Sequence, residues 1–372
     1  MRILHVASAF TPDNRFGGPT RVAVGLAAEQ RSRGHEVLLL GAGMGWPTLP
    51  DEVDGVPARL VGAFNPLPPL GWASVLAPGL GRALREELRR ADVVHVHLAR
   101  DLTTLRAALA ARRAGVPYVV QTHGMIDAAS GPLARAVDLA GTARAIRGAG
   151  VALTLTSAER DVVRRLTGGS TRAVDLPNGV DAPPATPRPS GVLFLARLHP
   201  RKGAVEFVRA AAAVAEAHPG TTFSVVGPDE GDGRAVQAAI DASAARTAIT
   251  VVGAVPPIEA RRLLAGATVY VLPAREEPFG MTVVEAMGAG RPVVLHATSL
   301  LAPAVVAAGA GWSFGPGGTH PALAEAVVAA LEPGAADAAG ARAALLVQER
   351  YSISGVVDAL QLHYDETVAH RR

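Results

Sequence analysis

The chain has 372 residues, of which 49% are hydrophobic, and its formal net charge is +3 at pH 7. This length and composition favour two globular domains with substantial cores. Cysteine is absent, which excludes disulfides and cysteine-based metal sites. Aromatic residues make up only 4% of the chain, which argues against a stacking surface for nucleic acid. We therefore expect a globular protein with no nucleic-acid partner.

Short apolar strands alternate with amphipathic helices in the first half of the chain. The strands are expected at residues 2–8, 37–40, 93–96, 118–122 and 152–156, with helical patterns between them, such as 21–33 and 102–113. This alternation predicts a parallel, doubly wound sheet with helices on its faces.

A proline-rich segment interrupts the alternation near residue 181 and predicts a linker at 183–190 between a first domain, 1–182, and a second domain, 191–353. The second domain repeats the pattern, with strands expected at 192–196, 222–226, 249–252, 269–272 and 292–295. Residues 354–372 have helical spacing and are expected to cross back onto the first domain. The predicted fold class is α/β, with two tandem Rossmann-like domains and an interdomain cleft at the carboxyl ends of the strands.

No signal peptide and no membrane-spanning stretch is recognisable, so the cytoplasm is the expected compartment. Residues 65–80 are apolar and rich in proline. Two interpretations of this segment remain open: peripheral contact with the inner membrane face, and burial within the first domain. The sequence gives no indication of the oligomeric state.

One residue stands out by its rarity: Lys202 is the single lysine among 36 basic residues. It lies at an expected strand-to-helix junction, and a helix N-terminus can hold an anion. A phosphate site and an incidental lysine on a solvated face are equally consistent with this position taken alone.

Two carboxylates, Glu277 and Glu285, flank a Pro-Phe-Gly turn that follows the expected strand 269–272. A helix is expected to begin near Met281, so the amides around Gly280 would face an anion. Each carboxylate can accept hydrogen bonds from hydroxyl pairs such as those of sugars and riboses. For an isolated pair, a helix-capping acid and a surface glutamate remain the simpler interpretation.

Together these motifs resemble one family. Arg197, Lys202 and Gly203, followed by Glu277-Pro-Phe-Gly and Glu285, resemble the nucleotide-sugar half of family-4 retaining glycosyltransferases with the GT-B fold. The first half matches that family in its order of motifs, which include Gly17-Gly18-Pro19, His95 and His97, Thr122-His123-Gly124, and Asn178-Gly179. The resemblance covers nearly the whole chain.

The resemblance implies a role for each matching residue. Arg197 and Lys202 would neutralise the donor diphosphate, Glu277 would hold donor-sugar hydroxyls, and His123 would donate a hydrogen bond to a sugar hydroxyl or a leaving phosphate oxygen. The other donor-binding residues would be Gly17, Gly18, Gly227, Val255, Phe279, Gly280, Met281, Thr282 and Glu285. Acceptor contacts would come from His97 and Asn178.

The implied reaction moves a hexose-type sugar from a nucleoside-diphosphate sugar to a hydroxyl of a small-molecule, glycan or lipid-linked acceptor, with retention of configuration. No metal and no other cofactor is expected, because no Asp-x-Asp motif or acid cluster demands one. The spacing of His95 and His97 could suit a metal, but a packed or cleft-lining pair is favoured.

The rival functions are a nucleotide-sugar epimerase and a non-catalytic nucleotide-sugar-binding protein. A dinucleotide oxidoreductase is weaker, since no Gly-x-Gly-x-x-Gly follows the strand that ends at Ser8. One departure from the family lies at 297–304, where the usual Gly-Gly turn and Pro-Glu pair are replaced, which puts that loop's contacts in doubt.

Overall fold

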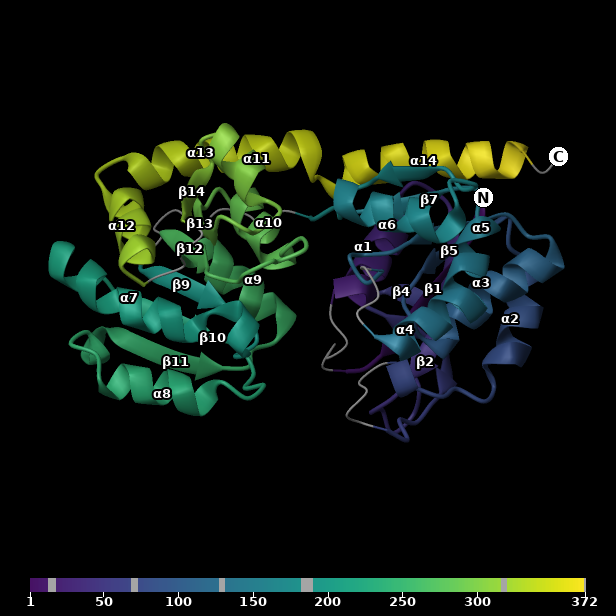
Figure 1. Cartoon of the computed structure of the whole chain (residues 1–372), viewed down its shortest axis with the longest axis horizontal. Helices are drawn as coiled ribbons and strands as arrows, with labels where there is room; N and C mark the ends of the chain where they lie inside the picture. The colour runs from purple at the N-terminus through teal and green to yellow at the C-terminus, as the bar shows by residue number, and fades with distance from the viewer. Residues whose placement is uncertain (13–17, 68–72, 127–130, 182–189, 316–319, 371–372) are drawn as a thin grey trace. The chain divides into compact units, whose positions relative to one another are not determined.

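The computed structural model describes residues 1–12, 18–67, 73–126, 131–181, 190–315 and 320–370. The chain divides into two compact units, which Figure 1 shows with their elements labelled. Unit 1 comprises Met1–Gly179 and Ile353–Arg372, and unit 2 comprises Val180–Ser352. The expected linker, 183–190, lies outside the described residues except for Ser190.

Unit 1 is built on one sheet, which in the described residues has the order β3-β4-β2-β1-β5-β6-β7-β8. Only the short β3–β4 pair is antiparallel; the other neighbours are parallel. The strands are β1 (Arg2–Phe10), β2 (Glu36–Gly43), β3 (Glu52–Val53), β4 (Val56–Gly62), β5 (Val93–His97), β6 (Tyr118–Gln121), β7 (Ala152–Thr154) and β8 (Ala173–Asp175).

Helices connect most of these parallel strands, whereas β2 and β4 are joined through β3. The helices are α1 (Gly18–Ser32), α2 (Leu80–Leu88), α3 (Leu102–Ala114), α4 (Pro132–Val137), α5 (Ala143–Arg147) and α6 (Ser157–Thr167), with a π-helical turn, η2 (Asp138–Thr142), between α4 and α5. Helix α3 shows how local sequence sets the bounds. Asp101 caps it by accepting from the amides of Thr103 and Thr104, and Gly115 ends it in the left-handed conformation.

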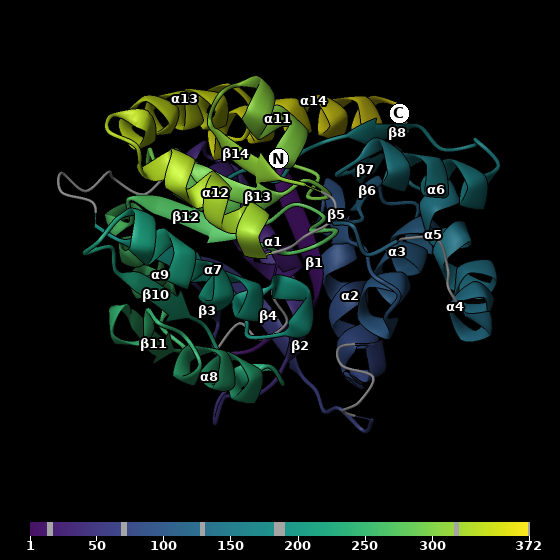
Figure 2. The same cartoon turned by 60° about the vertical axis from the view of Figure 1, so that its left-hand side comes forward.

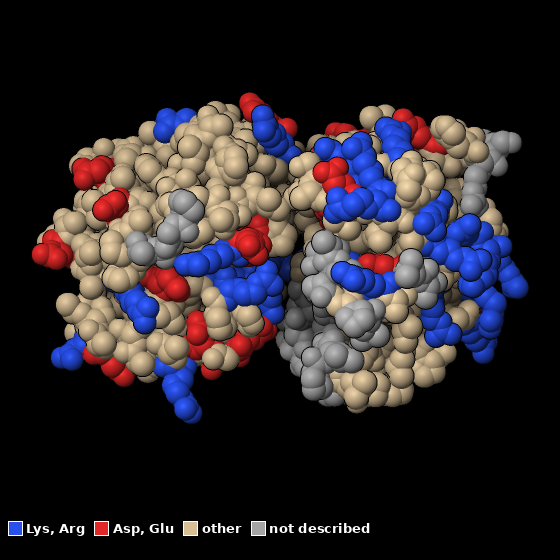
Figure 3. All heavy atoms as spheres, in the orientation of Figure 1, with Lys and Arg blue, Asp and Glu red and all other residues tan. Residues whose placement is uncertain are grey.

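The last helix, α14 (Ile353–Ala369), belongs to unit 1, where it packs against α1 and β6. Its buried face includes Val357, Leu360 and Tyr364. Figure 3 shows basic side chains gathered on the edge of unit 1 near α2 and α3. Exposed arginines of these helices and the turn after α2 are Arg82, Arg85, Arg89, Arg90, Arg106, Arg112 and Arg113.

Unit 2 contains a fully parallel sheet in the order β11-β10-β9-β12-β13-β14, which is the Rossmann order. Its strands are β9 (Val192–Leu195), β10 (Phe223–Val226), β11 (Ile249–Gly253), β12 (Val269–Leu272), β13 (Val293–His296) and β14 (Gly311–Phe314). The predicted α/β class with two Rossmann-like domains is confirmed.

The helices of unit 2 are α7 (Ala204–Ala217), α8 (Gly233–Asp241), α9 (Pro257–Gly266), α10 (Met281–Gly288), α11 (Ala302–Ala307), α12 (His320–Leu331) and α13 (Ala335–Arg350), with 3-10 turns η3 (Pro200–Lys202) and η4 (Arg246–Ala248). Helices α7 and α12 pack side by side, as Figures 1 and 2 show, and α10 packs against α13.

The strand order reverses beside β1 in unit 1 and beside β9 in unit 2. In open α/β sheets, ligands bind beyond the carboxyl ends of the strands at such a reversal. The residues that follow β9 and β12 therefore mark the expected ligand site of unit 2, and those that follow β1 and β5 mark that of unit 1.

Among the described residues, no helix is long and apolar enough to cross a membrane.

Candidate functional site

The junction between β9 and α7 is a compact turn that carries the single lysine. The backbone N–H of Lys202 donates to the His199 carbonyl at 2.8 Å, and the His199 side chain accepts from the Arg201 amide at 3.2 Å. Gly203 has φ 78°, and a Cβ there would lie 2.8 Å from Cβ of Pro273. Glycine therefore allows this junction to lie directly against the end of β12.

Across this contact, Lys202 Nζ forms an ion pair with Glu277 Oε2. The two side chains are only 22% and 12% exposed, so water screens their attraction less than it would at an open surface. The structure thus brings together two of the residues predicted from sequence, one after β9 and one after β12.

Glu277 precedes a turn that leads into α10. Gly280 caps this helix in the left-handed conformation with φ 69°. The first amides to donate back along the chain are those of Val283 and Val284, both to the Gly280 carbonyl. The amides of Gly280, Met281 and Thr282 therefore precede the first intrahelical bond, which is the arrangement that binds anions at a helix N-terminus.

Tyr270, which lies in β12, contacts both the end of β9 and the first turn of α10. Its hydroxyl lies 3.0 Å from the carbonyl oxygen of Leu195, to which it donates, and 2.7 Å from the Thr282 hydroxyl. Burial raises the pKa of Tyr270, and the nearby Glu277 and Glu285 carboxylates raise it further. The phenol therefore stays protonated and holds the end of β9 against the start of α10.

Two more predicted residues are packed rather than open. Glu285 is 4% exposed within α10, and Phe279 is 7% exposed. The Phe279 ring meets the Tyr351 ring edge-on, with centroids 5.8 Å apart. Phe279 thereby anchors the turn between Glu277 and α10.

The loop that departs from the family pattern supports the same turn. Glu276 adopts a left-handed conformation, with φ 52°, which is uncommon outside glycine. Its amide donates to Thr298 Oγ1 at 3.1 Å, and the Leu300 amide donates to the Glu277 carbonyl at 3.3 Å. Residues 297–300 therefore hold the backbone on which Glu277 sits, by contacts made through Thr298 and Leu300.

Arg197 lies apart from the Lys202–Glu277 pair. Its side chain is 54% exposed and pairs with Glu230 at 2.6 Å. Just before it, the chain passes so close to Gly227 that a Cβ on Gly227 would lie 1.9 Å from the Ala196 carbonyl oxygen. Gly227 is therefore needed for the close approach of the loops after β9 and β10.

Two hollows lie along these strand ends. One, of about 490 Å³, is lined by residues of the loops after β9, β10 and β11, with Leu198, Gly227, Asp229, Gly253 and Ala254 among them. The other, of about 430 Å³, lies beside the lysine turn and is lined by Arg201, Gly203, Glu276 and His296 among others. Val255 follows the lining residue Ala254 but is not itself in the lining.

In unit 1, Gly18 begins α1, whereas Gly17 lies outside the described residues. His123 follows β6 with φ 53°, and Gly124 follows with φ 75°. Glu159 holds this turn, because its carboxylate accepts from the amides of Gly124 at 2.7 Å and Leu155 at 2.8 Å. Burial raises the pKa of Glu159, while these hydrogen bonds oppose the shift.

Glu159 was not predicted as a site residue. The signal that could have found it is the Thr156-x-x-Glu159 pattern, which is typical of a capping box. Thr156 does cap α6 by accepting from the Glu159 amide. The Glu159 side chain, however, reaches the loop that carries His123.

His123 is 8% exposed, and its Nε2 lies 2.8 Å from His97 Nδ1. Burial lowers the pKa of His123 to about 3, so the ring is neutral near pH 7. A neutral imidazole carries one N–H. If that N–H serves His97, the donation to a sugar or phosphate expected from sequence is not offered in this arrangement.

His97 and Asn178, for which acceptor contacts were expected, are both buried in unit 1. His97 is 1% exposed, and its two ring nitrogens contact His5 at 3.0 Å and His123 at 2.8 Å. Asn178 is 4% exposed and accepts from Gln121 at 3.3 Å. The two ring nitrogens of His97 and the side-chain oxygen of Asn178 are therefore engaged inside unit 1.

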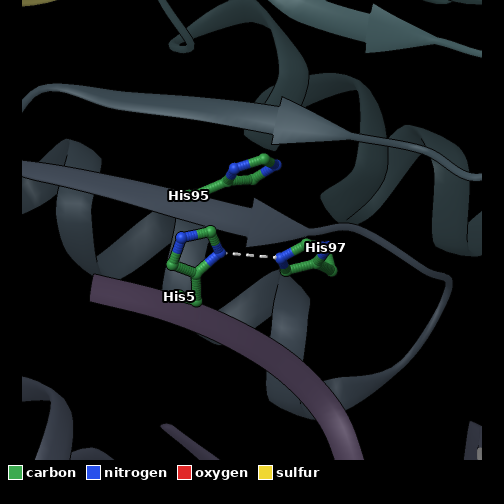
Figure 4. A group of neighbouring side chains, drawn as sticks. All are labelled: His5, His95 and His97. Atoms are coloured by element: carbon green, nitrogen blue, oxygen red, sulfur yellow. Dashed lines mark hydrogen bonds between the residues drawn. The ribbon is translucent and has the colours of Figure 1, made fainter. Parts of the chain in front are cut away.

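Figure 4 shows His5, His95 and His97, each of which has a nitrogen within 4.8 Å of those of the others, a spacing that could suit a metal. The ring planes of His95 and His97 are stacked, however, with centroids 4.4 Å apart and 6° between the planes. A metal lies in the plane of each imidazole that binds it. These two rings therefore cannot hold one ion in this arrangement.

Comparison with known proteins identifies the family of this chain. Residues 17–179 match the family described as glycosyl transferase 4-like domain, and residues 189–333 match glycosyl transferases group 1. A glycogen synthase of Mycobacterium tuberculosis is 30% identical over 376 residues, covering 92% of this chain and 89% of the relative. The chain is a family-4 glycosyltransferase of the GT-B fold.

Other relatives of this glycosyltransferase act on different molecules. A 2-deoxystreptamine glucosyltransferase of Streptomyces kanamyceticus is 30% identical, covering 68% of this chain and 74% of the relative. Among solved structures, sucrose-phosphate synthase from Thermosynechococcus elongatus has a TM-score of 0.77 at 18% identity, covering 99% of both chains. HepE of Anabaena, in complex with UDP and glucose, has a TM-score of 0.73 at 19% identity, covering 97% of this chain and 98% of that one.

Proposed function

We propose that this glycosyltransferase moves a hexose-type sugar from a nucleoside-diphosphate sugar to an acceptor hydroxyl, with retention of configuration and without a metal. The observation that carries the proposal is the Lys202–Glu277 pair beside the N-terminus of α10. It combines a cation and helix amides for a diphosphate with a carboxylate for sugar hydroxyls.

In this proposal the donor diphosphate takes the place of Glu277 as the partner of Lys202. Arg197 adds a second cation, after it exchanges Glu230 for phosphate. The amides of Gly280, Met281 and Thr282 stabilise the charge that develops on the leaving diphosphate. Glu277, released from Lys202, accepts hydrogen bonds from the donor sugar.

The nucleoside would occupy the 490 Å³ hollow, where Gly227, Gly253 and Ala254 present backbone to it. Glu285 would hold the ribose hydroxyls, and Val255 would border the base. Gly17 and Gly18 would also bind the donor, as the resemblance implies. Unit 1 would supply the acceptor site.

Retention would proceed by attack of the acceptor hydroxyl on the same face that the diphosphate leaves. A leaving phosphate oxygen accepts the proton of the attacking hydroxyl, so that no enzymic nucleophile and no metal is required. The cations and helix amides supply the charge stabilisation that a divalent metal gives in other transferases.

Nucleotide release is the test of this proposal. The purified protein is incubated with uridine, guanosine and thymidine diphosphate sugars, each with and without acceptors, in the presence of a chelator. The donor panel follows the UDP of the HepE structure and the GDP-mannose named in a mannosyltransferase relative. The acceptor panel includes aminocyclitols and lipid-linked glycans, because relatives are named for 2-deoxystreptamine and phosphatidylinositol dimannoside.

We expect acceptor-dependent release that survives the chelator, and a product with the anomeric configuration of the donor by NMR. Epimerised sugar formed from donor alone would favour the epimerase instead. Binding without release across the whole panel would favour a non-catalytic protein. Peripheral membrane contact stays a prediction, and co-sedimentation with anionic vesicles tests it.

A further inference from the structure

A connected group of eight polar side chains lies buried in the core of unit 1, where none is more than 8% exposed. They come from β1, β5, β6, helices α1 and α14, and the loops after β6 and β8. The members are His5, Gln30, His95, His97, Gln121, His123, Asn178 and Tyr364. So many buried polar groups are costly unless their hydrogen bonds are matched.

Within this group, the first arc is the chain of hydrogen bonds that runs from Gln30 through His5 and His97 to His123. Gln30 Oε1 lies 2.7 Å from His5 Nε2 and, as a carbonyl oxygen, can only accept. His5 therefore carries its proton on Nε2, because burial lowers its pKa to about 4 and leaves a neutral ring with one N–H.

The proton position on His5 determines the proton positions on the next two histidines. His5 Nδ1 must accept, so the proton between it and His97 Nε2, 3.0 Å away, belongs to His97. Burial also lowers the pKa of His97, so that its Nδ1 has no proton and accepts from His123 Nε2 at 2.8 Å. One glutamine carbonyl thus sets the tautomers of three histidines in turn.

The second arc starts at the other end of Gln30. Its Nε2 donates to the Tyr364 hydroxyl at 3.4 Å, and that hydroxyl lies 2.7 Å from His95 Nδ1. Tyr364 accepts from Gln30, so it satisfies its own buried hydrogen only by donating to His95. His95 therefore also carries its proton on Nε2. Farther along, Gln121 Nε2 donates to Asn178 Oδ1 at 3.3 Å.

The two arcs end in atoms that complement each other. His95 Nε2, Gln121 Oε1 and His123 Nδ1 are all buried without a hydrogen-bond partner of normal geometry. Gln121 is the amide neighbour of His95, and Asn178 is the amide neighbour of His123. The His95 Nε2–H has no acceptor and Gln121 Oε1 has no donor, so these two neighbouring groups complement each other. At the other gap, the Asn178 oxygen is engaged by Gln121, and the contact with Asn178 raises the pKa of His123. Closure of the ring at this gap requires the Asn178 amide to turn its nitrogen to the His123 lone pair.

We propose that these eight side chains form one closed ring of hydrogen bonds that runs in a single direction and fixes the proton of His123 on Nε2. His123 Nδ1 then accepts a hydrogen bond, and a substrate hydroxyl donates to it in place of the Asn178 amide. His5, His97 and Gln30 act as positioning residues through His123. The inference rests on the proposed function for the role of His123 in turnover, but the ring itself does not.

The experiment is long-range ¹⁵N–¹H NMR of the imidazoles in the whole protein at neutral pH, which reports the tautomer of each ring without any substrate. We expect His5, His95, His97 and His123 all to be Nε2–H. An Nδ1–H tautomer or an imidazolium at His123, or opposite tautomers within the His5–His97–His123 arc, overturns the ring. Coordinated imidazoles after addition of Zn²⁺ alone would also overturn it, in favour of a metal site.

Two variants test the two arcs separately. Gln30→Met removes the carbonyl that sets the first arc, so His123 should populate both tautomers although residue 30 does not touch it. Tyr364→Phe cuts only the second arc, so His95 should lose its fixed tautomer while His123 keeps Nε2–H. Unchanged tautomers in a folded Gln30→Met protein would contradict the relay.

Activity gives a separate readout. Gln30→Met should lower kcat on the order of tenfold or less, the effect of one neutral hydrogen bond lost in the transition state. If the tautomers are as expected but Lys202→Ala and Glu277→Ala proteins remain fully active, the proposed function fails and the ring stands. If the tautomers differ while those variants are inactive, the ring fails and the proposed function stands.

Discussion

Lys202 and Glu277 form an ion pair across the ends of the neighbouring strands β9 and β12, with both side chains mostly shielded from water. The pair joins a cation suited to a diphosphate with a carboxylate suited to a sugar. Lys202 and Glu277 are each other's partners in this structure, so under the proposed function donor binding exchanges these partners.

The first prediction concerns Glu277→Gln, which removes the charge but keeps the size of the side chain. The ammonium of Lys202 loses its competitor, so the nucleoside diphosphate product should bind several-fold more tightly. The sugar loses a charge-assisted hydrogen bond, so kcat should fall on the order of a hundredfold. Isothermal titration with the diphosphate and steady-state kinetics measure the two effects. A loss of both affinity and turnover would contradict the partner exchange.

The second prediction tests whether the site needs a lysine. Lys202→Ala should lower kcat on the order of a hundredfold or more, as for the loss of one charge-stabilising group. Lys202→Arg should also impair turnover, because a planar guanidinium does not replace a compact ammonium against Glu277. Arg209→Ala is the matched control, since Arg209 is an exposed cation on α7. Normal turnover by Lys202→Arg would make the rarity of lysine incidental.

Much of the fold of unit 2 could be predicted, because its core strands read as continuous apolar runs bounded by glycine and proline. The strand at 269–272 and the helix start at Met281 were both predicted from these signals and are observed. Strands β3, β4, β8 and β14 were missed. They carry partly exposed residues, and β4 also carries Pro57, so their patterns are weak.

The site was less predictable in unit 1. The two-residue spacing of His95 and His97 indicates that they share one face of a strand. The place of His5 depends on the parallel register that sets it opposite His95, and a single sequence does not contain this register. Tyr364 is 269 residues away from His95 along the chain, so only the packing of α14 shows that they meet.

The third prediction separates steric need from backbone strain at two glycines. Gly227→Ala places a Cβ 1.9 Å from a carbonyl oxygen, so we expect a loss of about 3 kcal/mol or more in stability. Gly231→Ala is the control, because Gly231 also has a positive φ, 108°, but nothing lies within 4 Å of its added Cβ. It should cost about 1–3 kcal/mol, because a non-glycine residue at this φ is strained but meets no other atom. Thermal unfolding measures both, and equal shifts would contradict a need for close approach at Gly227.

The fourth prediction concerns pH and the histidines of unit 1. Burial lowers the pKa of His5 to about 4 and that of His123 to about 3. In the unfolded chain both should titrate near 6.5, so between that pH and about 4 the unfolded state binds more protons than the folded state. Stability is therefore fully present above pH 6.5 and is lost as the pH falls toward 4.

The expected loss between pH 7 and pH 5 is about 2 kcal/mol from His5 alone. Urea unfolding followed by hydrogen exchange of β1 and β5 amides measures it within unit 1. His5→Gln removes one of the titrating groups, so its stability should fall less steeply over the same range, even if the variant is less stable at pH 7. A wild-type stability that stays constant from pH 7 to pH 5 would show that these histidines are not buried as neutral rings.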